Sequence, residues 1–126
     1  MTALVTGATV GIGYELARIL AHHQHDLALV ARDQKRLTNV AEELKGTFGV
    51  SVTVIPGDLQ DPKTPSKIFN DLHHQKIEID VLINNAGFGT HGKFAVANVE
   101  QQLGMIQVNI AALTHLTHLF LPSMIK

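Results

Sequence analysis

A glycine-rich segment directly behind a short apolar run constrains this chain more than any other feature. The run Ala3–Val5 leads into Thr6-Gly-Ala-Thr-Val-Gly-Ile-Gly13, and apolar residues then recur at helical spacing. This is the layout of a buried strand that turns tightly into a helix and presents the helix N-terminus to an anion. Gly7 allows a turn with positive φ, and Gly11 and Gly13 allow the backbone to approach a pyrophosphate closely. The alternative is a strand-to-helix turn that binds no ligand.

Composition excludes several classes of function. The chain has 126 residues, about the length of one domain, and its formal net charge is −1. It therefore has no excess of positive charge with which to bind nucleic acid or an anionic membrane. The absence of cysteine excludes disulfides and cysteine–zinc sites. No apolar run reaches the roughly 18 residues of a membrane span, and no signal-peptide pattern opens the chain. We expect a cytoplasmic protein that binds neither nucleic acid nor membrane.

Four short apolar runs have the length of strands buried on both faces. They are Ala3–Thr6, Leu27–Ala31, Ser51–Ile55 and Ile79–Ile83. Because a helical pattern separates each run from the next, the strands are expected to pair in parallel through helical crossovers. The prediction is an α/β fold of the Rossmann type: a doubly wound parallel sheet of four strands in the order 3-2-1-4, forming a single half domain over residues 1–126.

Periodic apolar residues predict a helix between successive strands and another after the last strand. The first helix is expected over Gly11–His22, and the second follows Asp33, whose carboxylate can cap it. In the third helix Pro62 is expected at the first helical position, with the helix reaching about His74. Asn98 is the expected cap of a long helix that continues toward the C-terminus.

Polar or glycine-containing segments fall at the predicted carboxyl ends of all four strands, where an open α/β sheet binds ligands. They are the glycine turn, Arg32, Asp58–Leu59 and Asn84–Gly87, and a further signal, Asn109, lies inside the long helix. The turn reads T-G-x-x-x-G-x-G rather than the general G-x-G-x-x-G. In this order and spacing the segments resemble the short-chain dehydrogenase/reductase family over Thr2–Lys126. The resemblance implies NAD(P)-dependent hydride transfer to or from a carbonyl or alcohol carbon of an unidentified substrate.

The resemblance also implies roles for individual residues. The cofactor-binding set is Gly7, Thr9, Gly11, Ile12, Gly13, Arg32, Asp58, Leu59, Asn85, Ala86 and Gly87. Asn109 is implied as a member of the catalytic set. Plainer interpretations exist: Asp58 as a turn residue, Asn84 and Asn85 as partners for backbone groups at the sheet end, and Asn109 as a local kink. We expect Asn85 through Gly87 to lie beside the cofactor and Asn84 to be largely structural.

Two residues compete to set the choice of cofactor. An acid about 20 positions beyond the glycines commonly binds the ribose 2′-OH of NAD, and Asp33 stands at that distance from Gly13. In the family, however, that acid ends the second strand, where this chain has Ala31 followed by Arg32. An arginine suits a 2′-phosphate, and Asp33 is better explained as a helix cap. The expected cofactor is NADP, with NAD as the alternative.

The general acid–base residues that the resemblance implies are missing. In the family a Ser and a Tyr-x-x-x-Lys follow the long helix, whereas the only tyrosine here is Tyr14, in the first predicted helix. We therefore expect the adenosine- and pyrophosphate-binding half of an oxidoreductase, truncated before a fifth strand and inactive alone. The alternatives are a stand-alone nucleotide-binding or interaction module and a non-functional truncated gene product.

The eight histidines do not predict a metal site. Five of them, His22, His23, His25, His73 and His74, lie near expected helix ends, where they complement the helix dipole. His115 and His118 are three positions apart on the last expected helix, and no third ligand stands at a recognisable spacing. Association is expected instead, because the fourth strand would form an open edge and one face of the long helix would lack part of its cover. That face carries Leu113, Leu116, Phe120 and Leu121. The prediction is a homo-oligomer built mainly through Asn98–Lys126.

Overall fold

The computed structural model describes all residues from Met1 to Lys126. Four strands, β1 (Thr2–Thr6), β2 (Asp26–Ala31), β3 (Val52–Pro56) and β4 (Val81–Ile83), form one parallel sheet in the order β3-β2-β1-β4. Leu4 in the central strand pairs with Ala28 on one side and with Leu82 on the other. The predicted fold class and strand order are confirmed.

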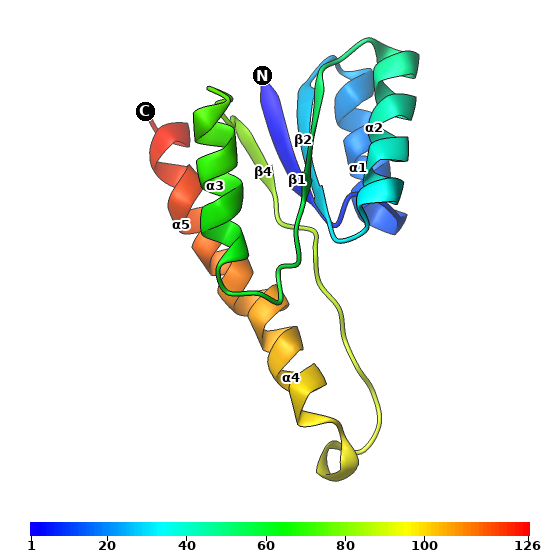
Figure 1. Ribbon diagram of the computed structural model, residues 1–126, viewed down its shortest axis with the longest axis vertical. Helices are drawn as coiled ribbons and strands as arrows, with labels where there is room; N and C mark the ends of the chain where they lie inside the picture. Colours follow the sequence, from blue (N-terminus) through cyan, green and yellow to red (C-terminus); the bar gives the residue numbers. More distant parts are fainter.

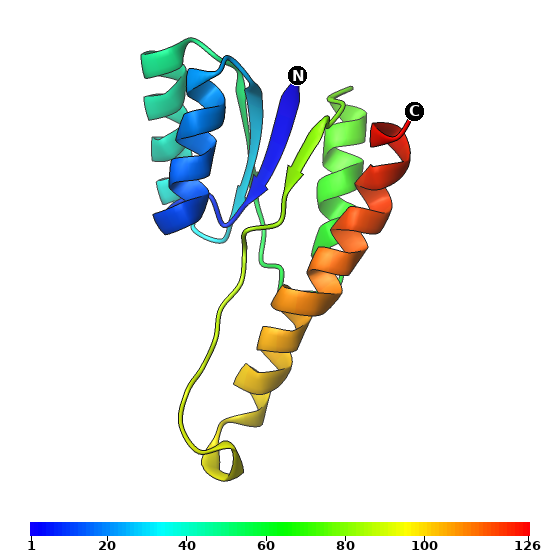
Figure 2. The same ribbon diagram turned by 180° about the vertical axis from the view of Figure 1, so that it is seen from behind.

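Helices cover both faces of the sheet (Figures 1 and 2). On one face lie α1 (Gly11–His22) and α2 (Gln34–Phe48); on the other lie α3 (Thr64–His74) and the long helix. The long helix consists of α4 (Val99–Ile106), a π-helical segment (Gln107–Ala112) and α5 (Leu113–Met124), and a short 3₁₀ turn (Phe94–Val96) precedes it. The N-terminal half of the long helix projects beyond the sheet, accompanied by the chain that leaves β4 (Figure 1).

The bounds of the first three strands differ from the sequence prediction by one residue, and two other boundaries differ by two residues. The third helix begins at Thr64 with Pro65 in its first turn, and Pro62 is not helical. Asp61 forms a turn there, because its carboxylate accepts from the Lys63 amide (2.9 Å) and its carbonyl accepts from the Thr64 amide (3.1 Å). Strand β4 begins at Val81 rather than at residue 79. Because the hydrogen bonds of Asp61 form a turn at Pro62, α3 begins only at Thr64, with Pro65 rather than Pro62 in its first turn.

The core consists of two apolar clusters, one on each face of the sheet. Val5 and Leu29 meet α1 and α2 on one face, whereas Leu4 and Val30 meet α3 and α5 on the other. Alternation of side chains along a strand explains this division, since neighbouring residues point to opposite faces. The division predicts that a substitution in β1 or β2 affects only one of the two helical layers.

Part of the predicted open face on the long helix is closed by the chain itself. Leu116 and Phe120 are buried in the second core cluster, at 1% and 3% exposure. They pack there because α5 lies alongside α3, and Phe120 stacks edge to face with Phe69 of α3. The expectation that these two residues lack cover is therefore wrong. Leu113 and Leu121 remain exposed, and β4 is a half-buried edge strand.

Candidate functional site

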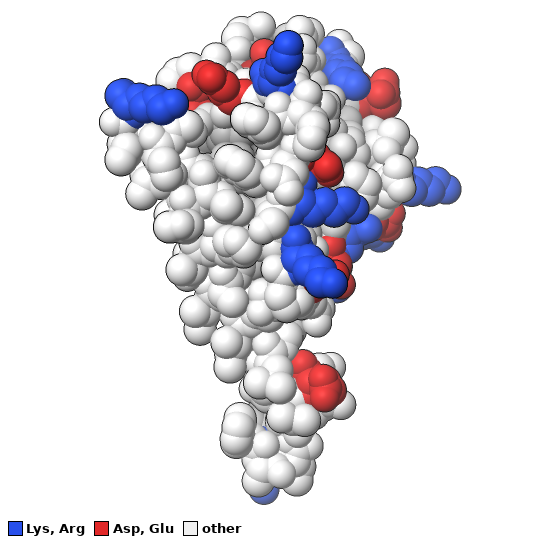
Figure 3. Space-filling view, turned by 60° about the vertical axis from the view of Figure 1, so that its left-hand side comes forward, with Lys and Arg blue, Asp and Glu red and all other residues white.

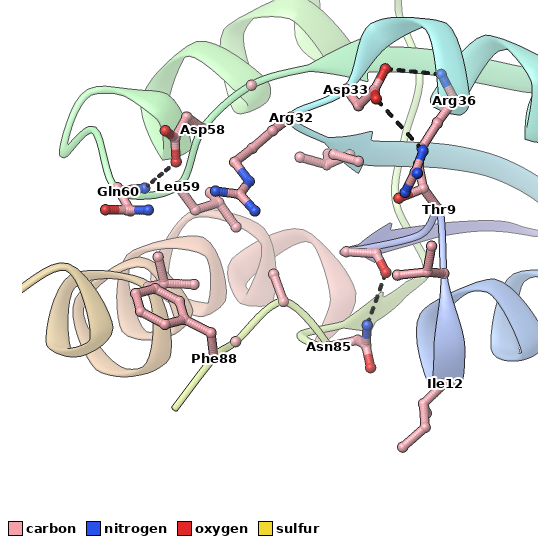
Figure 4. Close-up of a pocket in the computed structure, with 18 residues that line it drawn as sticks. Thr9, Ile12, Arg32, Asp33, Arg36, Asp58, Leu59, Gln60, Asn85 and Phe88 are labelled. Carbon is pink, nitrogen blue, oxygen red and sulfur yellow. Dashed lines mark hydrogen bonds and ion pairs between the residues drawn. The ribbon is translucent and has the colours of Figure 1, made fainter. Parts of the chain in front are cut away.

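A cleft of about 760 Å³ opens at the carboxyl edge of the sheet, where the loops after all four strands meet. This is the edge at which parallel α/β sheets bind ligands. Figure 4 shows that Arg32 and Asp58 approach it from the loops after β2 and β3, and that Asn85 approaches it from the loop after β4. The lining residues predicted from sequence are Gly7, Thr9, Ile12, Arg32, Asp58, Leu59, Asn85, Ala86 and Gly87.

The glycine turn leaves the N-terminus of α1 open toward this cleft. Gly7 and Gly11 have φ of +64° and +60°, values that disfavour any residue with a Cβ. The residue at the helix N-cap is Val10, whose side chain cannot accept a hydrogen bond, and the first turn contains no acidic residue. The first amides of α1 therefore have no side-chain partner and remain available to an anion.

Gly13 has a packing role that the sequence did not predict. It is buried beneath the turn and does not line the cleft. A Cβ at this position would overlap the carbonyl oxygen of Gly7 and the Asn85 side-chain nitrogen, and would lie 2.9 Å from the Gly7 carbonyl carbon. Gly13 is thus required for close packing of α1 against the turn.

Asn85 fixes the glycine turn to the end of β4. Its side-chain nitrogen donates to the carbonyl oxygens of Thr6 and Gly7, both at 3.1 Å. In return the Thr6 hydroxyl oxygen accepts from the amides of Asn85 and Ala86, at 3.1 and 2.9 Å. Because these four bonds join the segments after β1 and β4, they set the shape of the cleft where the two segments meet.

Asn84 has the structural environment that was predicted for it. Its side-chain nitrogen donates to the Thr117 hydroxyl of α5 at 3.1 Å, and it does not line the cleft. Its side-chain oxygen is buried with no hydrogen-bond partner in the chain. An unpaired buried acceptor is costly, so this position favours a further donor near the end of β4.

Asp33 is the N-cap of α2, as predicted. Its carboxylate accepts from the Arg36 amide at 3.1 Å and lies 3.7 Å from the Arg36 Nε. Arg32 precedes it on the exposed rim of the cleft, directly after β2. The Asp33 carboxylate is therefore already engaged in capping α2, whereas the Arg32 guanidinium caps no helix.

Asp58 combines a structural role with a place in the cleft. One carboxylate oxygen accepts from the Gln60 amide (2.9 Å), which closes a turn after β3, and its carbonyl accepts from the Thr64 hydroxyl (2.6 Å). Asp58 is therefore a turn residue, as the plainer interpretation holds, and it also lines the cleft. Leu59 beside it is buried against the second core cluster.

Asn109 lies in the π-helical segment and is bonded to the loop after β4 rather than to the cleft. Its side-chain oxygen accepts from the Phe88 amide at 3.0 Å, and its side-chain nitrogen donates to the Phe88 carbonyl at 2.8 Å. This π-helical segment is the local distortion of the helix that was predicted around Asn109. Segments of this kind often occur at functional sites. A Cβ on Gly87 would lie 3.0 Å from the Asn109 side-chain oxygen, so a larger residue there would press against this side chain.

Sequence reasoning missed several residues of the cleft. Arg36, Gln60 and Phe88 line it, while Gly11, Gly13 and Asn109 do not. The signal for Arg36 was present, because a side chain three positions after a helix N-cap can reach back toward that cap. Phe88 and Gln60 carry no such local signal, and only the fold brings them to the cleft.

Tyr14 lies away from the cleft, on α1. Its hydroxyl donates a hydrogen bond to the Glu43 carboxylate of α2. That hydrogen bond, followed by desolvation, raises the pKa of Tyr14 above its usual value. The structure contains no group of three or more His, Asp or Glu side chains that could hold a metal ion. Separately, none of its helices combines the length and the apolar character needed to cross a bilayer.

Comparison with known proteins agrees with this geometry. The sequence model for the short-chain dehydrogenases matches residues 1–126, the whole of the chain. The chain belongs to the short-chain dehydrogenase family. It is 34% identical over 125 residues to the ketoacyl reductase HetN of a Nostoc species, covering 99% of this chain and 43% of that protein. It is also 34% identical over 124 residues to sulfoacetaldehyde reductase 2 of Chromohalobacter salexigens, covering 98% and 48%.

Two solved structures superpose on nearly all of this chain. One is the L-sorbose reductase of Gluconobacter frateurii complexed with NADPH and L-sorbose, with a TM-score of 0.91, 29% identity, and coverage of 98% of this chain and 47% of that one. Another is a short-chain dehydrogenase of Sphingobium yanoikuyae in complex with NADPH, with a TM-score of 0.89, 38% identity, and coverage of 97% and 47%. This chain spans about half the length of these short-chain dehydrogenases.

Proposed function

We propose that residues 1–126 form the adenosine- and pyrophosphate-binding half of an NADP-dependent oxidoreductase. The observation that carries this proposal is the cleft at the carboxyl edge of the sheet, into which the uncapped N-terminus of α1 opens. An uncapped helix N-terminus at a glycine turn fits a pyrophosphate, because free amides and the helix dipole both favour negative charge. Relatives with this fold contain NADPH.

The residues of the cleft divide the cofactor among them in this proposal. The turn residues Gly7, Thr9 and Ile12 hold the pyrophosphate, and Gly11 gives the turn its shape through its positive φ. The loop with Asp58 and Leu59 holds the adenine. Segment Asn85–Gly87 continues the cleft toward the other end of the dinucleotide. When bound, the nicotinamide accepts or supplies the hydride that converts an alcohol and its carbonyl compound into one another. The predicted catalytic role of Asn109 takes the form of positioning, since its side chain holds the backbone of Phe88.

NADP rather than NAD is the proposed cofactor. Asp33 is engaged in capping α2, whereas Arg32 stands free on the rim directly after β2. A guanidinium there attracts a 2′-phosphate and gains nothing from a 2′-hydroxyl. Titration calorimetry of the purified chain is expected to give tighter binding of NADP than of NAD. Equal or tighter binding of NAD would reverse the assignment of the cofactor.

Residues 1–126 alone are proposed to lack reductase activity. The single tyrosine is on α1, bonded to Glu43 and outside the cleft. No phenol is therefore available there to exchange a proton with a substrate. The purified chain should not oxidise NADPH in the presence of aldehydes or ketones, whereas it should bind the nucleotide. Turnover with any of these carbonyl compounds would refute this part of the proposal.

A second copy of the chain is the proposed partner of the long helix. Leu103, Ile106, Ile110 and Leu113 are spaced by three, four and three residues and are 57%, 49%, 59% and 40% exposed. Such spacing forms a seam of the kind that pairs two helices. No Asp, Glu, Lys or Arg lies between Glu100 and Lys126, and Figure 3 shows a broad area without charged side chains on the side that carries α4 and α5. A two-fold contact along this seam buries apolar area and brings no like charges together.

Light scattering tests the association. The chain is expected to form a dimer or larger oligomer at micromolar concentration, and Ile110→Lys on the seam is expected to yield monomer. Gln101→Lys, on the exposed opposite side of the same helix, adds the same charge and should leave the oligomer intact. A monomeric parent chain, or equal behaviour of the two variants, would contradict a dimer through this seam.

A further inference from the structure

A second guanidinium, that of Arg36, reaches the same cleft as Arg32. Arg36 is in the first turn of α2 and lines the cleft. In Figure 4 its side chain extends from α2 toward the glycine turn that carries Thr9, whereas Arg32 extends toward Leu59. The two cations therefore approach the rim from different elements and in different directions.

The contact of Arg36 with Asp33 orients it without occupying all of its donors. Its Nε lies 3.7 Å from the Asp33 carboxylate, and the two side chains are 66% and 56% exposed. An exposed ion pair at this separation is weak, and a guanidinium has five N–H donors, so the outer nitrogens of Arg36 remain able to bind another anion. Asp33 thereby positions Arg36 at the rim while the carboxylate charge next to Arg32 is partly neutralised.

Resting on the proposed function, we infer that Arg36 is a second specificity-determining residue for the 2′-phosphate of NADP. A phosphate monoester carries nearly two negative charges near neutral pH, and a single guanidinium balances only one of them. Arg32 and Arg36 together supply matching charge, and their fork-shaped donors suit phosphate oxygens. Asp33 acts by positioning Arg36 and does not contact the 2′-hydroxyl.

Two fragments that differ only in the 2′-phosphate isolate this interaction. Adenosine 2′,5′-bisphosphate and adenosine 5′-monophosphate are titrated into the parent chain and into Arg36→Gln by calorimetry. The variant is expected to bind the bisphosphate about fivefold to tenfold more weakly and the monophosphate unchanged. Arg18→Gln on α1, an exposed arginine outside the cleft, is the matched control and should change neither affinity.

Asp33→Asn provides an independent test, because asparagine caps a helix nearly as well as aspartate but carries no charge. Its side-chain oxygen can still orient Arg36, whereas the negative charge that repels a nearby phosphate is gone. The variant is therefore expected to bind the bisphosphate about twofold to fivefold more tightly and the monophosphate unchanged. Weaker monophosphate binding in Asp33→Asn would show that this carboxylate contacts the ribose, which would overturn its assignment as a positioning residue.

The outcomes separate this inference from the proposed function. If the parent chain bound neither fragment, the proposed nucleotide site itself would be wrong. If the parent bound the bisphosphate and Arg36→Gln bound it equally well, only the role of Arg36 would be refuted. Equal losses for both fragments in Arg36→Gln would indicate a structural effect on the rim and would also overturn the inference.

Discussion

Helix α1 and the long helix cover opposite faces of the same sheet, yet they are built in opposite ways. The buried face of α1 consists of Gly13, Ala17 and Ala21, at a spacing of four residues, and its outer positions include charged side chains. The long helix buries Leu116 and Phe120 on one side and still exposes apolar residues on the other. Small residues allow a helix to lie closer to a sheet than large ones do, so α1 and the long helix are expected to lie at different distances from it.

This difference shows what each helix contributes. Close packing of α1 fixes the position of the glycine turn, because Gly13 lies so near to Gly7 and Asn85 that no Cβ could fit between them. The long helix contributes four buried residues to the second core cluster, Val108, Ala112, Leu116 and Phe120, and its remaining apolar side chains are available for contact. Substitutions on the buried face of α1 should therefore change both nucleotide binding and the free energy of unfolding. Substitutions on the long helix should change the free energy of unfolding or the association of chains without changing nucleotide binding.

The largest effect is expected from Gly13→Ala. The added methyl group would overlap backbone atoms of Gly7, which cannot move without breaking the turn. We expect a loss of about 3 kcal/mol or more in the free energy of unfolding, together with loss of nucleotide binding. Chemical denaturation and calorimetry measure these two quantities.

Gly46→Ala is the control for that substitution. Gly46 lies inside α2 with open space where a Cβ would be. Alanine there should stabilise the chain by about 0.5 to 1 kcal/mol and leave nucleotide binding unchanged. A Gly13→Ala chain as stable as the parent would show that α1 does not need close contact with the turn.

Leu116→Ala and Leu113→Ala compare the two sides of the long helix. Leu116 is 1% exposed and Leu113 is 40% exposed, although they stand three positions apart. Truncation of Leu116 leaves a cavity and is expected to lower the free energy of unfolding by about 2 to 5 kcal/mol. Truncation of Leu113 should cost less than about 1 kcal/mol at protein concentrations low enough to keep the chain monomeric. Equal losses in the free energy of unfolding would mean that Leu113, like Leu116, is buried within a single chain.

Val10→Asp sharpens the role of the open N-terminus of α1. Val10 has the extended backbone of an N-cap residue but no side-chain acceptor. An aspartate can bond the first amides of the helix and should stabilise the chain by about 1 kcal/mol. Because it uses those amides and adds negative charge, it should weaken binding of ADP about tenfold or more. A variant more stable than the parent that binds ADP equally well would show that the pyrophosphate does not use this helix end.

The strand order and much of the cleft could be predicted from the sequence because their signals are local. The glycine turn, the Asp33 cap and the position of Arg32 after β2 each depend on a few neighbouring residues. Parallel pairing followed from helical patterns between apolar runs, since a crossover fixes strand direction. Apart from Asn109, which lies in the long helix, the residues implied by the family resemblance lie at or directly after the carboxyl ends of the strands.

The remaining features depend on contacts between distant segments. Periodicity showed that Leu116 and Phe120 share a face, but only the position of α3 decides that this face is covered. The role of Gly13 depends on Asn85, which lies more than seventy positions away in the sequence. The start of α3 depends on a choice between two prolines that the Asp61 turn settles. Sequence pattern alone contains none of these distances.

The smallest effect is expected from the contact between Tyr14 of α1 and Glu43 of α2. The hydrogen bond to the Glu43 carboxylate raises the pKa of Tyr14 above its usual value of 10.0. A raised pKa in the folded state means that the contribution to stability is fully present below the unfolded pKa and is lost as pH rises through the folded pKa. Tyr14→Phe should therefore cost less than about 1 kcal/mol at neutral pH and nothing at strongly alkaline pH.

Because Tyr14 is the only tyrosine, titration of phenolate absorbance reports this group alone. Glu43→Gln should bring the pKa of Tyr14 down toward its usual value, since a neutral amide neither repels the phenolate nor holds the phenolic proton as strongly. The denaturation curves of the parent chain and Tyr14→Phe should then converge over the alkaline interval in which the parent's phenol ionises. A Tyr14 pKa unaffected by Glu43→Gln would show that the two side chains do not interact and that only apolar packing joins α1 to α2.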